Sequence, residues 1–155
     1  MQQPYSSFTQ NGKVGRVYRL SDHSARKKRA QTLFKALAVL RGGAKQAQFG
    51  TDIAPKAIIV AGLTCGNPIF NHLFESDSDS GQAVLDIKAL QEVAKDYADR
   101  IVTPILVGIR TGYLKNENEV RTLATKPISQ SNGTTIEIKI LTPIEAANSI
   151  GELLP

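Results

Sequence analysis

Residues 25–52 read ARKKRAQTLFKALAVLRGGAKQAQFGTD and concentrate much of the chain's positive charge and glycine. We place the consecutive cations Arg26, Lys27, Lys28 and Arg29 in the first turn of a helix, where the dipole and free N–H groups are already positive. A bound polyanion would offset the repulsion between these positive charges, so we predict a phosphate-binding surface here. Apolar residues then recur at the spacing of a helix with one buried face: Ala30, Leu33, Phe34, Leu37, Ala38 and Leu40.

Both ends of this helix carry sequence signals. Since Ser21, Asp22 and Ser24 are competent N-caps, the helix should begin within residues 21–25. Gly42-Gly43 follows the apolar residues, and a left-handed glycine commonly closes a helix. The turn beyond carries Lys45 and Gln46, which suit a phosphate, but GGAKQ lacks the spacing of a nucleoside triphosphate loop. A nucleotide triphosphatase is therefore excluded.

The charge of the chain is unevenly distributed. Its formal net charge is +5, yet residues 12–45 hold ten cations and one acid, Asp22. The remainder holds nine cations and thirteen acids. Such a division is typical of a nucleic-acid footprint. A solvated surface helix carries similar runs of cations, so that interpretation stays open.

Length and composition limit the class of protein. A chain of 155 residues with 41% hydrophobic content forms one domain, residues 1–155, with a real core. No run approaches the ~18 apolar residues of a membrane span, and residues 1–15 lack the apolar core of a signal peptide. The single cysteine, Cys65, fits a reducing compartment. We expect a cytoplasmic protein without membrane partners.

No catalytic group or metal site is predicted. His23 and His72 are isolated and lack metal-ligand spacing with Cys65, which itself has no neighbouring base in the sequence. Asp52 is more typical of a cap or turn than of a general base, because acid–base work needs a perturbed partner. We therefore expect a binding protein rather than an enzyme, with no cofactor and no metal.

The remaining patterns predict further strands, helices and loops. Residues 13–20 predict a strand or extended arm whose Arg16 and Arg19 are candidate RNA contacts, although an edge strand kept soluble by its charges has the same pattern. Gly108, inside the strand at 104–110, permits close approach of another backbone. The other predicted segments are a loose arm at 1–12 ending in an Asn-Gly turn, a central strand at 56–63, a strand at 134–141, helices at 85–102 and 144–154, and flexible loops at 75–83 and 111–133.

Together these elements predict an α+β fold with helices on one face of a mostly antiparallel sheet. Ferredoxin-like and RNA-recognition-motif topologies fit the pattern best. A polyanion would then bind on the sheet face and at the loops that adjoin the helix ends.

The basic helix and the following GGAKQAQFGTDIAPKAIIVAGLTCGNPIF, residues 42–70, resemble the second half of the DevR (Cas-seven) family. These proteins are the backbone subunits of type I CRISPR effector complexes of the Cascade type, which serve antiviral defence. The shared features are Gly42-Gly43 after a helix, Lys45-Gln46-Ala47, Asp52 ahead of Pro55, and the apolar strand at 58–60. The motifs are short, and the match covers roughly residues 13–155.

The resemblance implies a modified RNA-recognition-motif fold whose copies polymerise along a guide RNA (crRNA) together with other CRISPR effector subunits. The subunit would grip the RNA backbone while the bases pair with target DNA, as a scaffold and not a nuclease. Carried over by position, the RNA-facing residues are Arg26, Lys27, Lys28, Arg29, Gly42, Gly43, Lys45 and Gln46.

The chain departs from the family in length. Members are about twice as long, and the first strand of their core sheet lies in the half that this chain lacks. Either the reading frame is truncated, a separate N-terminal fragment completes the fold, or residues 13–20 fill the gap. An incomplete sheet exposes backbone groups at its edge, so we expect a poorly soluble or oligomeric chain. An alternative function is a small protein-interaction or regulatory module whose basic patch binds an acidic partner.

Overall fold

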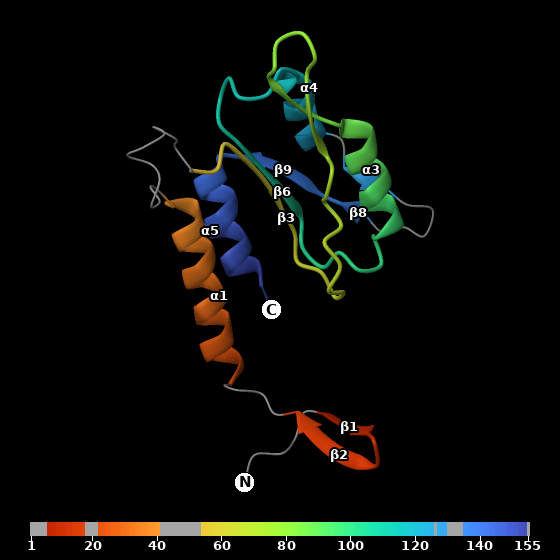
Figure 1. Cartoon of the computed structure of the whole chain (residues 1–155). Coiled ribbons are helices and arrows are strands. Elements are labelled where there is room, and N and C mark those ends of the chain that lie inside the picture. The colour runs from red at the N-terminus through yellow and green to blue at the C-terminus, as the bar shows by residue number, and fades with distance from the viewer. Residues whose placement is uncertain (1–5, 18–21, 41–53, 126, 130–134, 155) are drawn as a thin grey trace.

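The computed structural model describes residues 6–17, 22–40, 54–125, 127–129 and 135–154. A three-stranded sheet in the order β3-β6-β9 forms its centre (Figure 1). β3 is antiparallel to β6, and β6 is parallel to β9, so the fold is α+β with a mixed sheet. The sheet strands and the helices are β3 (Ala57–Val60), β6 (Ile105–Ile109), β9 (Ile138–Leu141), α1 (His23–Ala38), α3 (Ile87–Asp96), α4 (Glu117–Thr122) and α5 (Pro143–Leu153).

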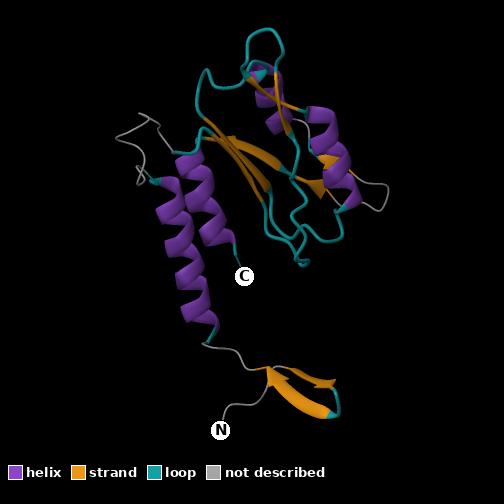
Figure 2. Cartoon of the chain, in the orientation of Figure 1, coloured by secondary structure: helices purple, strands orange, loops and turns teal. Residues whose placement is uncertain are grey.

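Helices cover both faces of this sheet, not one face as expected (Figure 2). Val107 of β6 packs in the same cluster as Leu90 of α3, while Leu106 packs with Ile150 of α5. Neighbouring residues of a strand point to opposite faces. Because all five residues of β6 are buried, each face of the strand requires a covering layer.

The expected strand at 104–110 is confirmed as β6. The single strand expected at 134–141 is instead two strands within the described residues 135–141: β8 (Thr135–Ile136), in a separate two-stranded sheet, and β9, in the central sheet. The order of the central sheet also differs from the expectation. β6 is the central strand, whereas β3 pairs on one side only among the described residues. Residues 56–63 were expected to be central, but every residue of β3 is only half-buried. The alternation in 134–141 places Ile136 and Ile138 inside and Lys139 outside, as its pattern predicts.

Gly108 allows α5 to lie close against the sheet. A Cβ at this position would be 2.8 Å from Cα of Pro143 and 3.0 Å from Cβ of Ala146. The close approach expected at this glycine is therefore present. α5 begins with a capping box, in which the Thr142 hydroxyl accepts a hydrogen bond from Glu145 N and the Glu145 carboxylate accepts one from Thr142 N.

The N-terminal region forms a hairpin of β1 (Ser6–Gln10) and β2 (Lys13–Val17). Asn11 and Gly12, at φ 52° and 71°, make the left-handed turn that suits the twist of paired strands. The predicted Asn-Gly turn is confirmed, while Ser6–Gln10 is a strand and not part of a loose arm. Among the described residues β2 pairs with β1 alone, so this part of 13–20 does not extend the central sheet.

The two segments expected to be flexible loops contain ordered elements. Asp77 organises the turn between β4 (Phe74–Ser76) and β5 (Ala83–Leu85), because its carboxylate accepts hydrogen bonds from Ser80 N at 2.8 Å and Lys115 Nζ at 2.8 Å. The Asn116 side chain fixes the start of α4 by donating to Leu85 O at 2.8 Å and accepting from Leu85 N at 3.2 Å. Local polar side chains, and not apolar periodicity, specify these segments. Their elements besides α4 are β4 (Phe74–Ser76), β5 (Ala83–Leu85), the 3-10 helix Leu123–Thr125 and β7 (Ile128–Ser129), which pairs with β8 (Thr135–Ile136).

Within the described ranges, no helix is long and apolar enough to cross a membrane.

Candidate nucleic-acid interface

The basic segment begins at a well-formed helix start. α1 starts at His23, and its N-cap Asp22 accepts a hydrogen bond from Ala25 N at 2.7 Å, so the predicted start is confirmed. The Asp22 carboxylate therefore already occupies part of the positive helix terminus. Residues 26–29 fall at the fourth helical residue and beyond, later than the first turn in which we expected them. Any anion bound there would be held by side chains more than by backbone N–H groups.

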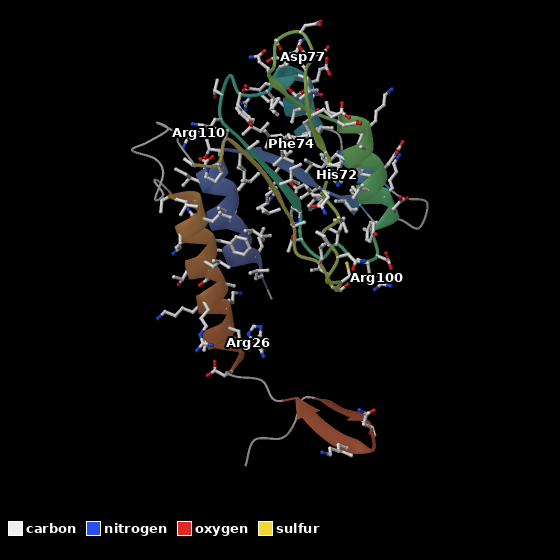
Figure 3. All side chains as sticks on the ribbon, in the orientation of Figure 1. Arg26, His72, Phe74, Asp77, Arg100 and Arg110 are labelled. Carbon is white, nitrogen blue, oxygen red and sulfur yellow. The ribbon has the colours of Figure 1, made fainter. Side chains whose placement is uncertain are left out.

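The cations of residues 26–29 surround the helix. Consecutive residues of an α-helix differ in direction by about 100°, because one turn takes about 3.6 residues. Arg26 and Lys27 are half-buried and line a cavity beside α1, whereas Lys28 and Arg29 are exposed. Arg26 projects from the N-terminal half of α1 (Figure 3). The cluster therefore consists of a cavity pair, Arg26 and Lys27, and an outer pair, Lys28 and Arg29.

The ion pairs among the described residues join neighbouring or local groups and none involves residues 26–29. Within the described residues, no ion pair joins residues 26–29 to a carboxylate. Asp77 instead pairs with Lys115 at 2.8 Å, far from Arg26 in Figure 3, and Glu117 pairs with Arg121 at 2.6 Å. The Lys115 ammonium, followed by Ser80, holds the pKa of Asp77 well below its usual value. The four cations thus remain available to an external anion.

Most of the rest of the predicted site lies outside the described residues, and α1 ends before it. α1 ends at Ala38, earlier than the Gly42-Gly43 end that the sequence predicts, and the N–H of its C-cap Val39 bonds to Ala36 O and Leu37 O. At a rise of about 1.5 Å per residue, Ala38 lies ~14 Å along the axis from Arg29. Gly42, Gly43, Lys45, Gln46 and Arg19 lie outside the described residues. Arg16 lies in β2 opposite Ser7.

Only part of the predicted apolar face of α1 is buried. Ala38 is 4% exposed and Phe34 packs against the cluster of Leu106 and Ile150, but Leu33 is 68% exposed. Leu37 is also exposed, so Leu33 and Leu37 form a second apolar stripe on α1 with no cover in the described structure, and Leu40, just beyond the helix, is exposed as well. The sequence pattern predicted one buried stripe, whereas α1 has two. Only one of them is buried, because α1 packs mainly against α5. A Cβ on Gly151 of α5 would lie 3.2 Å from Gln31 Cα, which shows how closely the two helices meet.

Sequence reasoning missed the cavity that Arg26 and Lys27 line. Its walls come from α1, the residues after β3, Val102 and the end of α5, at positions far apart in the chain. No short motif could have indicated it. In the part of the chain that the structure describes, no three His, Cys, Asp or Glu side chains are grouped as metal ligands would be.

No family model, curated protein or solved structure matches this chain. The resemblance to the DevR family therefore remains a prediction from sequence.

Proposed function

We propose that the chain is a guide-RNA-binding scaffold subunit of a CRISPR interference complex. It polymerises along the RNA with further copies and other effector subunits, and leaves the bases free to pair with target DNA. The basic half of α1 holds the ribose-phosphate backbone. Backbone contacts carry no sequence information, so binding is independent of RNA sequence. In this proposal the α+β fold is a modified RNA-recognition motif. It is supported by the exposure of Lys28 and Arg29 on α1.

A single observation carries the proposal. Four adjacent cations, residues 26–29, lie on one helix without an acidic partner among the described residues. Clustered unpaired cations repel one another, and a polyphosphate strand neutralises several of them together while releasing counterions. The family-like segment at residues 42–70 adds support from sequence.

The test is co-purification combined with RNA affinity. The chain should retain bound RNA of uniform length, and a variant with Ala at Arg26, Lys27, Lys28 and Arg29 should lose it while keeping its circular dichroism spectrum. The control Lys88→Gln/Lys139→Gln removes two exposed cations elsewhere and should retain the RNA, judged against Lys28→Gln/Arg29→Gln, which removes two from the cluster. Nucleic-acid-free protein, or equal loss in both variants, would refute the proposal. If the four-residue variant unfolds, the cations of residues 26–29 stabilise the fold and the RNA-binding role is not supported.

The exposed stripe of α1 favours a second candidate function. Leu33 and Leu37 present apolar surface on a helix that has no acidic residue, and Leu40 extends this surface just beyond the helix end. Such a surface suits a protein partner with an apolar, acid-flanked surface. The chain would then be a protein-interaction module. Nucleic-acid-free material that purifies with one stoichiometric protein would support this function, and Leu33→Gln should release that protein.

A further inference from the structure

A cavity lies between the N-terminal half of α1 and the body of the molecule. Its volume is about 540 Å³, within the range of about 300–1,000 Å³ typical of small-molecule sites. The segment Gly62–Thr64, which follows β3, forms one wall, and Leu154 at the end of α5 contributes to the floor. This position is distinct from the outer pair, Lys28 and Arg29, which are exposed and do not line it.

The walls of this cavity divide into a cationic side and an apolar side. The α1 side presents His23 and the cavity pair, Arg26 and Lys27, and among the described residues no Asp or Glu lines the cavity. The opposite side is aliphatic and leaves Val102 53% exposed and Leu153 41% exposed. Aliphatic surface is unfavourable in water, and the cations beside it attract negative charge. An amphiphilic anion would cover the aliphatic surface and pair with the cations.

Three backbone N–H groups beside this cavity already donate hydrogen bonds within the protein. Gly62 N donates to Thr103 Oγ1 at 2.7 Å, and Thr64 N donates to Arg100 O at 2.9 Å. Val102 N donates to Gly62 O at 2.9 Å. A ligand that needs several neutral hydrogen bonds, such as a sugar or the edge of a base, finds little here. The cavity can therefore recognise a ligand mainly through its charge and through apolar contact.

We propose that this cavity binds an organic anion of small-molecule size with an aliphatic body. The carboxylate or other acidic head group accepts hydrogen bonds from Arg26 and Lys27, and the body lies against Leu63, Val102 and Leu153. The charge comes from side chains, because Asp22 already caps the helix. This site does not depend on RNA binding, because two of the four cations, Lys28 and Arg29, do not line the cavity.

Isothermal titration calorimetry with decanoate, below its micelle concentration and on RNA-free protein, tests the proposal. Decanoate should bind at one site per chain. Decyltrimethylammonium has the same aliphatic length but the opposite charge, and butyrate has the charge without the body. Each should bind at least about tenfold more weakly, because each lacks one of the two means of recognition.

Paired variants locate the site. Arg26→Gln/Lys27→Gln should weaken decanoate by about tenfold or more, as loss of charge-assisted hydrogen bonds does. Lys28→Gln/Arg29→Gln, with the same change in charge, should stay within about twofold of the parent. Leu153→Gln, near the end of α5, should also weaken binding. Absence of saturable binding, equal binding of the cationic amphiphile, or equal effects of the two paired variants would overturn the proposal. Failure of RNA binding alone would leave it standing.

Discussion

Gly108→Ala should destabilise the fold, because α5 lies directly over this glycine. The new Cβ would be 2.8 Å from Pro143 Cα and 3.0 Å from both Ala146 Cβ and Ile58 Cγ1. Two of these atoms belong to a helix whose start is fixed by its capping box. Relief therefore requires α5 to move away from the sheet. Overpacking of this kind costs about 1–3 kcal/mol, and the lower entropy of the unfolded alanine chain offsets about 0.4–1 kcal/mol. The net loss should be about 1–2 kcal/mol.

Urea denaturation followed by circular dichroism measures this loss. With a slope of about 1–3 kcal/mol per M, the midpoint should fall by roughly 1 M. Gly66→Ala is the matched control, because nothing lies within 4 Å of a Cβ at that position and its φ is not positive. The control should be unchanged or slightly more stable. Equal midpoints for the two variants would refute the close packing of α5 on β6.

Three further predictions concern α1, acid and self-association. Phe34→Ala should lower the free energy of unfolding by about 1–3 kcal/mol, which is less than the cost for a fully buried ring. Leu33→Ala should change it by less than about 0.5 kcal/mol. Equal urea midpoints for the two variants would contradict this prediction. The folded-state pKa of Asp77 is depressed, so its stabilisation is present above its unfolded pKa of about 3.9 and is lost as pH falls through the folded value. The gap in unfolding free energy between the parent and Asp77→Asn should therefore stay constant from about pH 5 to 8 and narrow below about pH 4. Sedimentation velocity should show that the parent self-associates and that Leu33→Gln/Leu37→Gln shifts it toward monomer; a dispersed parental monomer at high concentration would count against the exposed stripe.

Local signals in the sequence predict much of the fold. The strict alternation at 134–141 assigns inward and outward residues because a strand has a two-residue period. Asp22 marks the start of α1, and Asn11-Gly12 marks the hairpin turn, because each side chain or backbone conformation acts within a few residues. Pro143 likewise lies at the start of α5.

Features that depend on distant partners could not be predicted. Which apolar stripe of α1 is buried depends on Gly151 of α5, more than a hundred residues away. The order β3-β6-β9 and the parallel pairing of β9 are likewise set by packing and not by any single strand. The same reason explains the candidate site: residues 26–29 were identified from composition, but their division into a cavity pair and an outer pair depends on Val102 and Leu153.

The salt dependence of RNA affinity tests most directly whether the cations of α1 hold a phosphate backbone. Each single-strand phosphate contact contributes about −0.7 to the slope of log affinity against log salt. The Lys28→Gln/Arg29→Gln variant should therefore bind single-stranded RNA with a slope shallower by about 1.4, the contribution of two contacts. The slope should become shallower by the same amount with RNAs of different sequence. A flat salt dependence in the parent, or an unchanged slope in the variant, would contradict the account.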